Sequence, residues 1–464
     1  MSNPQPLVVI NVVALTPELI EYAPNVKKLA ESGEMAPLEG VFPALTQSAQ
    51  ASMLTGVSPS EHGVVANGWY WRQTGEVRNW LQANAMLGAE PFYRTAQERA
   101  QKQGHDFSCA KMFWWFNQGS GADCSVTPKP HYGADGSKAF DVYTNPPELA
   151  GTLEDKYGKF PFFNFWGPMA GLASSQWIAD STATVIRDKR PSLTLAYLPH
   201  LDYDLQRFGP SGCDLTKLVS EVDQCAGRII DAAKSINAKV LVVSEYGISD
   251  VSHPVYLNRE LRKAGMLKVR GGPFGEMVDY FESNGFAVCD HQVAHVYVKN
   301  VDDITRVKEL LEKFDGVSQV LDRKDQAQYA IDHQNAGELV ALSDSDSWFA
   351  YPYWLDDRSV PDFARTIDIH RKPGYDPCEL FLDPEIAAPK LKLAWRLLQK
   401  KLGFRTLMDV VPLDATLVRG SHGLPPSAPI KGPLIISSES ESLPSSPKMT
   451  DFKDLALSML GLTE

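Results

Sequence analysis

Residues 7–15 have the sequence LVVINVVAL, an apolar run broken only by Asn11, and TPELIEYAPNVKKLAESG follows over residues 16–33. An apolar run of this length is typical of a strand buried on both faces of a parallel sheet. In the second segment Thr16 can cap a helix, Pro17 fits the first turn, and Gly33 can end the helix. We therefore expect a strand and a helix, the repeating unit of an α/β sheet.

Three further apolar stretches extend this pattern, namely TLAYLP at 194–199, KVLVVSEYG at 239–247 and GPLIISS at 432–438. Helical stretches such as SEVDQCAGRIIDAAKSI at 220–236 separate them. This alternation predicts an α/β fold with a mostly parallel central sheet and helices on both faces. Functional sites in such folds lie at the carboxyl ends of the strands.

Two segments are expected to be insertions into this core. Residues from about 112 to 168 are rich in Trp, Phe, Pro and Gly and lack periodicity, which predicts long loops over one end of the sheet. Residues 265–384 contain the strand pattern FAVCDHQVAHVYV, the helical pattern ITRVKELLEKF and the aromatic loop WFAYPYWLDD, which together predict a smaller α+β subdomain. We therefore assign residues 1–264 and 385–464 to the core and residues 265–384 to an inserted cap.

The composition of the chain excludes some classes of binding partner. The 464 residues include 45 basic and 57 acidic side chains, a net charge of −12, which opposes general attraction to nucleic acid or to anionic membranes. Six scattered cysteines without metal-finger spacing indicate reduced thiols. No segment approaches 18 uninterrupted apolar residues, and no basic residue precedes the run at Leu7. We expect a cytoplasmic protein with a small-molecule partner and no nucleic-acid or membrane partner. The sequence does not indicate an oligomeric state.

The stretch that most strongly indicates chemistry is FPALTQSAQASMLTGVSPSEHGVVANGWY at residues 42–70. Thr46 follows a predicted strand at residues 35–42 and precedes small residues suited to a helix, so its hydroxyl would lie at a helix N-terminus. Unpaired N–H groups and the helix dipole stabilise an alkoxide or a bound phosphate at such a position. The alternative is that Thr46 is an ordinary N-cap residue.

This stretch resembles the type I phosphodiesterase/nucleotide pyrophosphatase group of the alkaline phosphatase superfamily through Pro43, Thr46, Thr55-Gly56, Pro59, His62-Gly63 and Asn67. Further motifs of that group are similar, in the same order, to LPHLDYDLQRFGP at 198–210, SEYGIS at 244–249 and GSHGLPPSAPIKGPLIIS at 420–437. The resemblance implies an alkaline-phosphatase-like three-layer sandwich. It also implies a hydrolase of phosphodiester or pyrophosphate bonds in a small phosphorylated metabolite, with Thr46 as nucleophile and Asn67 as a donor to phosphate. Because the sequence shows no signal segment, unlike many secreted members of that family, we expect the metabolite to be intracellular.

In that family two divalent metals about 4 Å apart hold the nucleophile and the phosphate. The resemblance would assign one ion to Asp202, Gln206 and His422 and the other to Asn11, Thr46, Glu245 and Tyr246. Here Asn11, Gln206, Glu245 and Tyr246 replace the family's Asp, His, Asp and His. Losing carboxylate and imidazole ligands weakens the hold on two dications and shifts the preference from zinc towards Mg²⁺, Mn²⁺ or Ca²⁺. We expect one or two divalent ions (Zn, Mn or Mg).

The spacing around Asp202 leaves two local arrangements open. Asp202 and Gln206 are four residues apart and would share one face of a helix that starts after Pro199. In an extended backbone, His200, Asp202 and Asp204 would point to the same side instead.

Other residues are candidates for substrate binding or for structural roles. We name Trp69, His200 and Arg371 as candidate substrate-binding residues, since aromatic rings can wall a pocket and Arg can grip a phosphate. In DHQVAH, His291 and His295 would share one face of a strand, as ligands or, more commonly, as hydrogen-bonded structural groups. The loop with Arg371 and Lys372 could grip a phosphate or be an ordinary solvated loop.

Two alternatives to hydrolysis remain open. The altered ligand positions would suit a catalytically degenerate binding protein on the same fold. A phosphotransferase is the other possibility, in which Thr46 carries a phosphate between two sites on a substrate.

Overall fold

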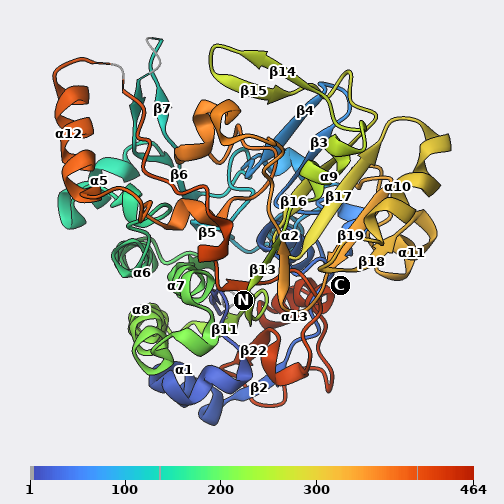
Figure 1. The fold of residues 1–464 in the computed structure, drawn as a ribbon. Helices are drawn as coiled ribbons and strands as arrows, with labels where there is room; N and C mark the ends of the chain where they lie inside the picture. The colour runs from blue at the N-terminus through green and yellow to red at the C-terminus, as the bar shows by residue number, and fades with distance from the viewer. Residues whose placement is uncertain (1–4, 135–136, 405, 464) are drawn as a thin grey trace.

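An eight-stranded sheet forms the centre of the protein, in the order β2-β22-β11-β1-β10-β5-β6-β9 (Figure 1). The computed structural model describes residues 5–134, 137–404 and 406–463. The five middle strands are parallel, namely β11 (Lys239–Val243), β1 (Leu7–Val12), β10 (Leu193–Leu198), β5 (Cys109–Met112) and β6 (Cys124–Pro128). The flanking strands run antiparallel to their inner neighbours, with β22 (Leu434–Ser437) on β11, β2 (Glu34–Pro37) on β22, and β9 (Val142–Asn145) on β6. The predicted mostly parallel sheet is confirmed.

Helices cover both faces of this sheet, as expected for the three-layer α/β class. One group consists of α1 (Pro24–Ser32), α6 (Leu172–Lys189) and α8 (Leu215–Ser235), and α8 packs against both β1 and β10. Asp214 caps α8 by accepting a hydrogen bond from the Lys217 backbone N–H at 3.1 Å. A second group joins α2 (Thr46–Thr55), α4 (Phe92–Lys102) and α13 (Phe452–Met459). All six residues of β1 are buried, because the strand lies between these layers.

Local expectations differ from the structure in three places. The helix expected over residues 16–33 is divided into a 3₁₀ turn at Pro17–Tyr22 and α1, because Pro24 cannot continue a preceding helix and begins a new one. The strand expected at residues 35–42 ends already at Pro37. Residues 112–168 are not loops alone, since they supply β6, β9 and helix α5 (Leu149–Tyr157).

The segment expected to be an α+β insertion contains a second sheet. FAVCDHQVAHVYV forms a hairpin of β16 (Gly285–Asp290) and β17 (Val293–Val298), because His291 adopts a left-handed conformation with φ 58° and reverses the chain. The hairpin pairs with β19 (Leu339–Ser343) and then β18 (Val317–Leu321), while α10 (Ile304–Leu311) and α11 (Arg323–Gln328) pack nearby. The domain boundaries at 265 and 384 stay a prediction.

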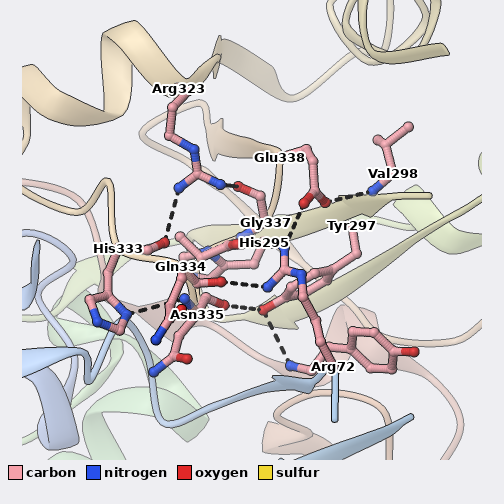
Figure 2. A network of polar contacts seen from close by, with 12 residues as sticks. Arg72, His295, Tyr297, Val298, Arg323, His333, Gln334, Asn335, Gly337 and Glu338 are labelled. Carbon is pink, nitrogen blue, oxygen red and sulfur yellow. Dashed lines mark hydrogen bonds and ion pairs between the residues drawn. The ribbon is translucent and has the colours of Figure 1, made fainter. Parts of the chain in front are cut away.

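Arg72 ties this second sheet to the segment that carries the Thr46 motif. It follows β3 (Gly68–Trp71), and its guanidinium donates to the carbonyl oxygens of Gln334 at 2.6 Å and Ala336 at 3.0 Å (Figure 2). It also forms a 2.6 Å ion pair with Glu338. The Tyr297 hydroxyl completes the contact by donating to the Asn335 carbonyl at 2.8 Å. The insertion is therefore fixed against the core by directed polar contacts as well as by apolar packing.

Candidate active site

The carboxyl ends of three neighbouring parallel strands meet at one side of the central sheet. Asn11 lies near the end of β1, Asp202 lies just beyond β10, and Glu245 and Tyr246 follow β11. The order β11-β1-β10 in the sheet makes these positions adjacent, although they are up to 235 residues apart in sequence. The parallel strands thus bring these side chains together at the edge of the sheet where the sequence predicted that they would meet.

A cavity of about 1150 Å³ opens at this place, and its lining includes Thr46, Asp202, Gln206, Tyr246 and His422. Asn11 and Glu245 are buried behind these residues. The structure therefore brings together all seven residues named as the nucleophile and the metal ligands. Their assignment to catalysis or to metal binding stays a prediction.

Thr46 is the first residue of α2 and not its N-cap. Leu45 occupies the cap position, and no side-chain cap bond is present there. The Thr46 hydroxyl lies instead 3.0 Å from the Tyr246 hydroxyl, in the cavity lining. The hydroxyl thus makes no cap bond and lies in the wall of the cavity that a substrate can enter.

Glu245 accepts two short hydrogen bonds from amide side chains. Asn11 Nδ2 and Gln50 Nε2 each donate to Glu245 Oε1 at 2.6 Å. Burial raises the pKa of Glu245 to about 8, although the amide donors and the neighbouring Thr46 hydroxyl lower it. Gln50 also accepts a hydrogen bond from the Trp115 backbone N–H at 2.9 Å, so it holds the carboxylate to the wall of the cavity.

Asp202 and Gln206 lie on one face of α7 (His200–Phe208), so the helical arrangement holds and the extended one is wrong. Gln206 Nε2 donates to Asp202 Oδ2 at 2.6 Å, and the Tyr246 hydroxyl donates to Asp202 Oδ1 at 3.4 Å. Burial raises the pKa of Asp202 to about 7, more than these donors lower it. Thr46, Tyr246 and Asp202 therefore form one continuous chain of hydrogen bonds.

A row of four aromatic rings in contact borders this chain of hydrogen bonds. The Tyr246 and His422 rings are 3.6 Å apart and inclined by only 8°. His422 lies 3.8 Å from the His291 ring, which in turn stacks on Tyr375 at 3.9 Å. Tyr375 donates its hydroxyl to Gln206 Oε1 at 2.7 Å. The stack fixes the planes of both imidazoles, and burial lowers the pKa of both well below the usual value.

These residues do not fit a two-ion centre. Asn11 and Gln206 direct their amide N–H groups, and not their oxygens, at the two carboxylates. Tyr246 presents a phenol to Asp202 in place of the family's imidazole, and burial raises the pKa of this phenol well above its usual value. Within the part of the chain that the structure describes, no group of three or more His, Cys, Asp or Glu side chains could hold a metal ion. The hydrogen bonds engage part of the expected ligand set, whereas Asn11 Oδ1 and Glu245 Oε2 are buried without a hydrogen-bond partner among the described residues.

Asn67 lies behind Thr46 and links α2 to the hairpin of the insertion. Its Oδ1 accepts from the Gln47 backbone N–H at 3.0 Å, and its Nδ2 donates to Asp290 Oδ1 at 3.2 Å. The amide is therefore engaged on both sides, and it fixes the first turn of α2.

The two histidines of the hairpin have different partners. Asp290 Oδ1 lies 2.7 Å from His291 Nδ1, whereas a ring nitrogen of His295 lies 3.1 Å from the Val65 carbonyl oxygen. The hairpin turn separates these two histidines, so His295 takes the structural role.

The three candidate substrate-binding residues lie in different places. Arg371 lines the cavity, where its guanidinium pairs with Asp368 at 2.6 Å. Trp69 is buried in β3 and stacks on Trp71, and His200 is buried at the start of α7, so neither lines the cavity. The neighbouring Lys372 is also excluded from solvent, being only 1% exposed and paired with two carboxylates.

Two residues of the site were missed from sequence. Gln50 lies one helical turn after Thr46, and the four-residue spacing on a helix that begins at Thr46 could have identified it. Tyr375 lies in an irregular loop, and no local pattern marks it.

Comparisons with known proteins show the family of the chain. A family model described as type I phosphodiesterase / nucleotide pyrophosphatase matches residues 7–376. An uncharacterized pyrophosphatase/phosphodiesterase of Schizosaccharomyces pombe is 22% identical over 237 residues, which cover 50% of this chain and 42% of the relative. Ectonucleotide pyrophosphatase/phosphodiesterase family member 1 of Homo sapiens is 24% identical over 265 residues, 54% of this chain and 24% of the relative. The matches thus span less than half the length of either relative.

Solved structures share the fold over almost the whole chain. An inactive variant of murine ectonucleotide pyrophosphatase / phosphodiesterase 5 in complex with AMP superposes with a TM-score of 0.59 at 14% identity, covering 99% of this chain and 96% of that one. Phosphonoacetate hydrolase from Sinorhizobium meliloti in complex with phosphonoformate gives 0.61 at 13% identity, covering 98% and 96%. At these identities the likeness shows the fold alone.

Proposed function

Because the chain belongs to the type I phosphodiesterase / nucleotide pyrophosphatase family of hydrolases, we propose that it cleaves phosphodiester or pyrophosphate bonds with Thr46 as the nucleophile. The observation that carries this proposal is the placement of the Thr46 hydroxyl, in the cavity lining at the first residue of a buried helix. The N-terminal N–H groups and dipole of that helix favour a bound phosphate.

The chain of hydrogen bonds beside Thr46 supports a route for its proton. As the Thr46 oxygen bonds to phosphorus, the bond from phosphorus to the ester oxygen breaks, the hydroxyl proton passes to Tyr246, and Tyr246 gives its own proton to Asp202. Water then attacks the phosphothreonine, and the proton that this water loses neutralises the departed ester oxygen. Asp202 returns its proton through Tyr246 to the Thr46 oxygen as phosphate or a phosphomonoester leaves. The groups that relay the Thr46 proton are side chains of the protein.

Members of the family generally depend on divalent metal ions. No step here is assigned to an ion, because the donor set of this site does not fit two of them. Protonated Tyr246 and the amides of Asn11, Gln50 and Gln206 supply hydrogen bonds to the carboxylates instead.

The walls of the cavity support a substrate with a large apolar or flat group on the phosphate. Trp80, Trp115, Phe165 and Trp166 line it, and aromatic walls of this kind bind flat or apolar groups. Lys129, Lys138 and Arg371 also line it and would offset the negative charge of a phosphate ester. All six cysteines are free, which supports a reducing compartment and hence an intracellular metabolite.

A second function, binding without hydrolysis, is favoured by one observation. Both carboxylates of the site are engaged by amide donors that the family pattern lacks. In that case the cavity holds a phosphorylated ligand and Thr46 only contacts it.

Hydrolysis of bis(p-nitrophenyl) phosphate by variants of Thr46 tests the proposal. After chelation, and with Mn²⁺, Mg²⁺ or Zn²⁺ re-added in turn, we expect Thr46→Ala to lose about 10³-fold or more in kcat and Thr46→Ser to keep a measurable part. The matched control is Thr55→Ala at the other end of α2, whose hydroxyl donates to the Ala51 carbonyl of the same helix at 2.7 Å. Full activity of Thr46→Ala would overturn the mechanism, and a folded wild type that is inactive with every ion would support the binding function.

A further inference from the structure

Asn67, the phosphate donor that the resemblance names, does not reach the cavity beside Thr46. It is only 1% exposed and is not among the residues that line the cavity. Its Nδ2 donates to Asp290 Oδ1 at 3.2 Å, and its Oδ1 accepts from the Gln47 backbone N–H at 3.0 Å. The same bond occupies the Gln47 N–H, one of the groups that the start of α2 would otherwise offer to an anion. A side-chain donor to the phosphate would therefore come from another part of the wall.

Gln82 carries a side-chain amide in the wall of the cavity that no described residue engages. Among the described residues, three side-chain amides line the cavity, those of Gln82, Gln118 and Gln206. Gln206 donates to Asp202, and Gln118 Oε1 accepts from Lys129 Nζ at 3.2 Å. In contrast, Gln82 Oε1 is buried without a hydrogen-bond partner, and Gln82 Nε2 donates to none of the described residues. The N–H groups of Gln82 are therefore available to a ligand.

Backbone contacts hold Gln82 close to the first turn of α2. Leu81 and Gln82 line the cavity together with Thr46. Gln47, the residue after Thr46, donates its Nε2 to the Leu81 carbonyl at 2.9 Å. From another side, the Gln118 backbone N–H donates to the Gln82 carbonyl at 3.0 Å. The backbone at Gln82 is thus fixed by two neighbouring segments, whereas its side-chain amide stays unengaged.

A phosphate oxygen is the acceptor that suits an amide at this place. During attack by a nucleophile, negative charge lies on the non-bridging oxygens of the phosphate, and fixed N–H donors stabilise that charge in a site shielded from water. The dipole of α2 favours a phosphate at the same position, because Thr46 is the first residue of that helix. A Gln amide donates without carrying a charge, so it forms no ion pair with the buried carboxylates of Asp202 and Glu245.

We propose that Gln82 donates a hydrogen bond from Nε2 to a non-bridging oxygen of the phosphate that Thr46 attacks. This contact rests on the function proposed above, and it makes or breaks no covalent bond. Gln82 then touches the substrate, whereas Asn67 acts through the first turn of α2, which it fixes. Gln82 lies beyond residues 42–70, the stretch that carries the resemblance, so that motif could not indicate it.

Hydrolysis of two diesters, bis(p-nitrophenyl) phosphate and ethyl p-nitrophenyl phosphate, by variants of Gln82 tests the proposal. We expect Gln82→Ala to lose about 10²-fold or more in kcat, the usual effect of removing one donor to a transition-state oxyanion. Gln82→Glu keeps the shape of the side chain but presents a carboxylate to the phosphate, so its loss should be at least as large. The loss should be similar for the two substrates, because both carry the same diester phosphate.

The matched control is Gln101→Ala, on the exposed side of α4 and outside the cavity lining, which should hydrolyse both diesters as the wild type does. Circular dichroism checks that each variant is folded. An unchanged kcat in Gln82→Ala would overturn the proposal. A loss confined to one of the two substrates would also overturn it, because Gln82 would then contact the organic group and not the phosphate.

Calorimetric binding of bis(p-nitrophenyl) phosphate separates this proposal from that of hydrolysis. If the wild type binds the diester without hydrolysing it, the hydrolytic function is wrong, and binding at least tenfold weaker by Gln82→Ala still supports the contact. Equal binding by Gln82→Ala and the wild type would refute the contact as well. A wild type that neither binds nor hydrolyses the diester would refute both proposals.

Discussion

The buried cation Lys372 gives the sharpest test of how the wall of the cavity is held. Its Nζ lies 2.6 Å from Asp376 Oδ2 and 2.7 Å from Glu379 Oε1, and the Lys372 and Glu379 side chains are each 1% exposed. Burial lowers the pKa of Lys372, but the two carboxylates outweigh it and raise the pKa above its usual value. We expect Lys372→Met, which keeps the length of the side chain and removes the charge, to be strongly destabilising.

The magnitude follows from what the substitution leaves behind. Removing one partner of a buried ion pair costs about 3–5 kcal/mol of unfolding free energy, because the remaining charge is uncompensated. A second estimate of the loss in unfolding free energy is similar. Protonating a carboxyl group of ordinary pKa at pH 7 costs about 3.7 kcal/mol. Glu379 is the group that takes up the proton, because burial already raises its pKa in the presence of Lys372.

The pH dependence has a definite sign. In the variant the folded protein binds a proton that the unfolded chain releases at pH 7, so the variant gains stability relative to the wild type as pH falls. We expect the difference in unfolding free energy to shrink by about 1.4 kcal/mol between pH 7 and pH 6. Urea unfolding followed by tryptophan fluorescence at the two pH values measures it.

Two further variants complete the test. Lys27→Met is the matched control, since Lys27 pairs with Glu21 at 2.6 Å on the surface, and its loss should cost less than about 1 kcal/mol. Lys372→Met/Asp376→Asn should recover part of the loss, because only one unpaired carboxylate then remains. A Lys372→Met protein as stable as the wild type at pH 7 would refute the reasoning, as would a loss that did not change with pH.

Two further predictions concern acid stability and metal binding. Burial lowers the pKa of His62 to about 3, and its Nδ1 accepts from the Val64 backbone N–H at 3.1 Å, so its contribution to stability is complete above pH 6.5 and is lost as pH falls towards 3. His62→Gln should remove about 1.4 kcal/mol per pH unit from the slope of unfolding free energy between pH 6 and pH 4, and an unchanged slope would contradict this prediction. Because amide donors occupy both carboxylates, calorimetric titration with Zn²⁺ should show no tight two-site binding, and Asn11→Asp/Gln206→His/Glu245→Asp/Tyr246→His should restore it. Tight binding of two ions by the wild type would show that the hydrogen-bonded arrangement yields to metal.

Much of the fold was predictable because its signals are local. The apolar runs that became β1, β10 and β11 are short, dense and separated by helical patterns, so each could be recognised without its partners. The antiparallel pairing of β22 could not be predicted, because nothing within the strand states its direction relative to β11. The reversal at His291 was missed for a similar reason, since a single residue with positive φ divides an otherwise continuous strand pattern.

The candidate site also contains features that local sequence patterns predict and features that depend on contacts between distant residues. The motif around Thr46 and the four-residue spacing of Asp202 and Gln206 are local, and both could be named from the sequence. The bonds from Gln50 to Glu245 and from Tyr375 to Gln206 join residues 195 and 169 positions apart, so no local pattern contains them. The same holds for the stack of Tyr246 on His422.

The sequence by itself determined the α/β class, the family and the identity of the polar residues at the ends of the strands, because apolar periodicity and motif spacing act over short distances along the chain. Only the tertiary structure decided which hydrogen bonds those polar residues form with one another. Whether an amide presents its oxygen to a cation or its N–H to a carboxylate depends on which groups the folded sheet brings within about 3 Å. Order in the sheet, and not order in the chain, sets that distance.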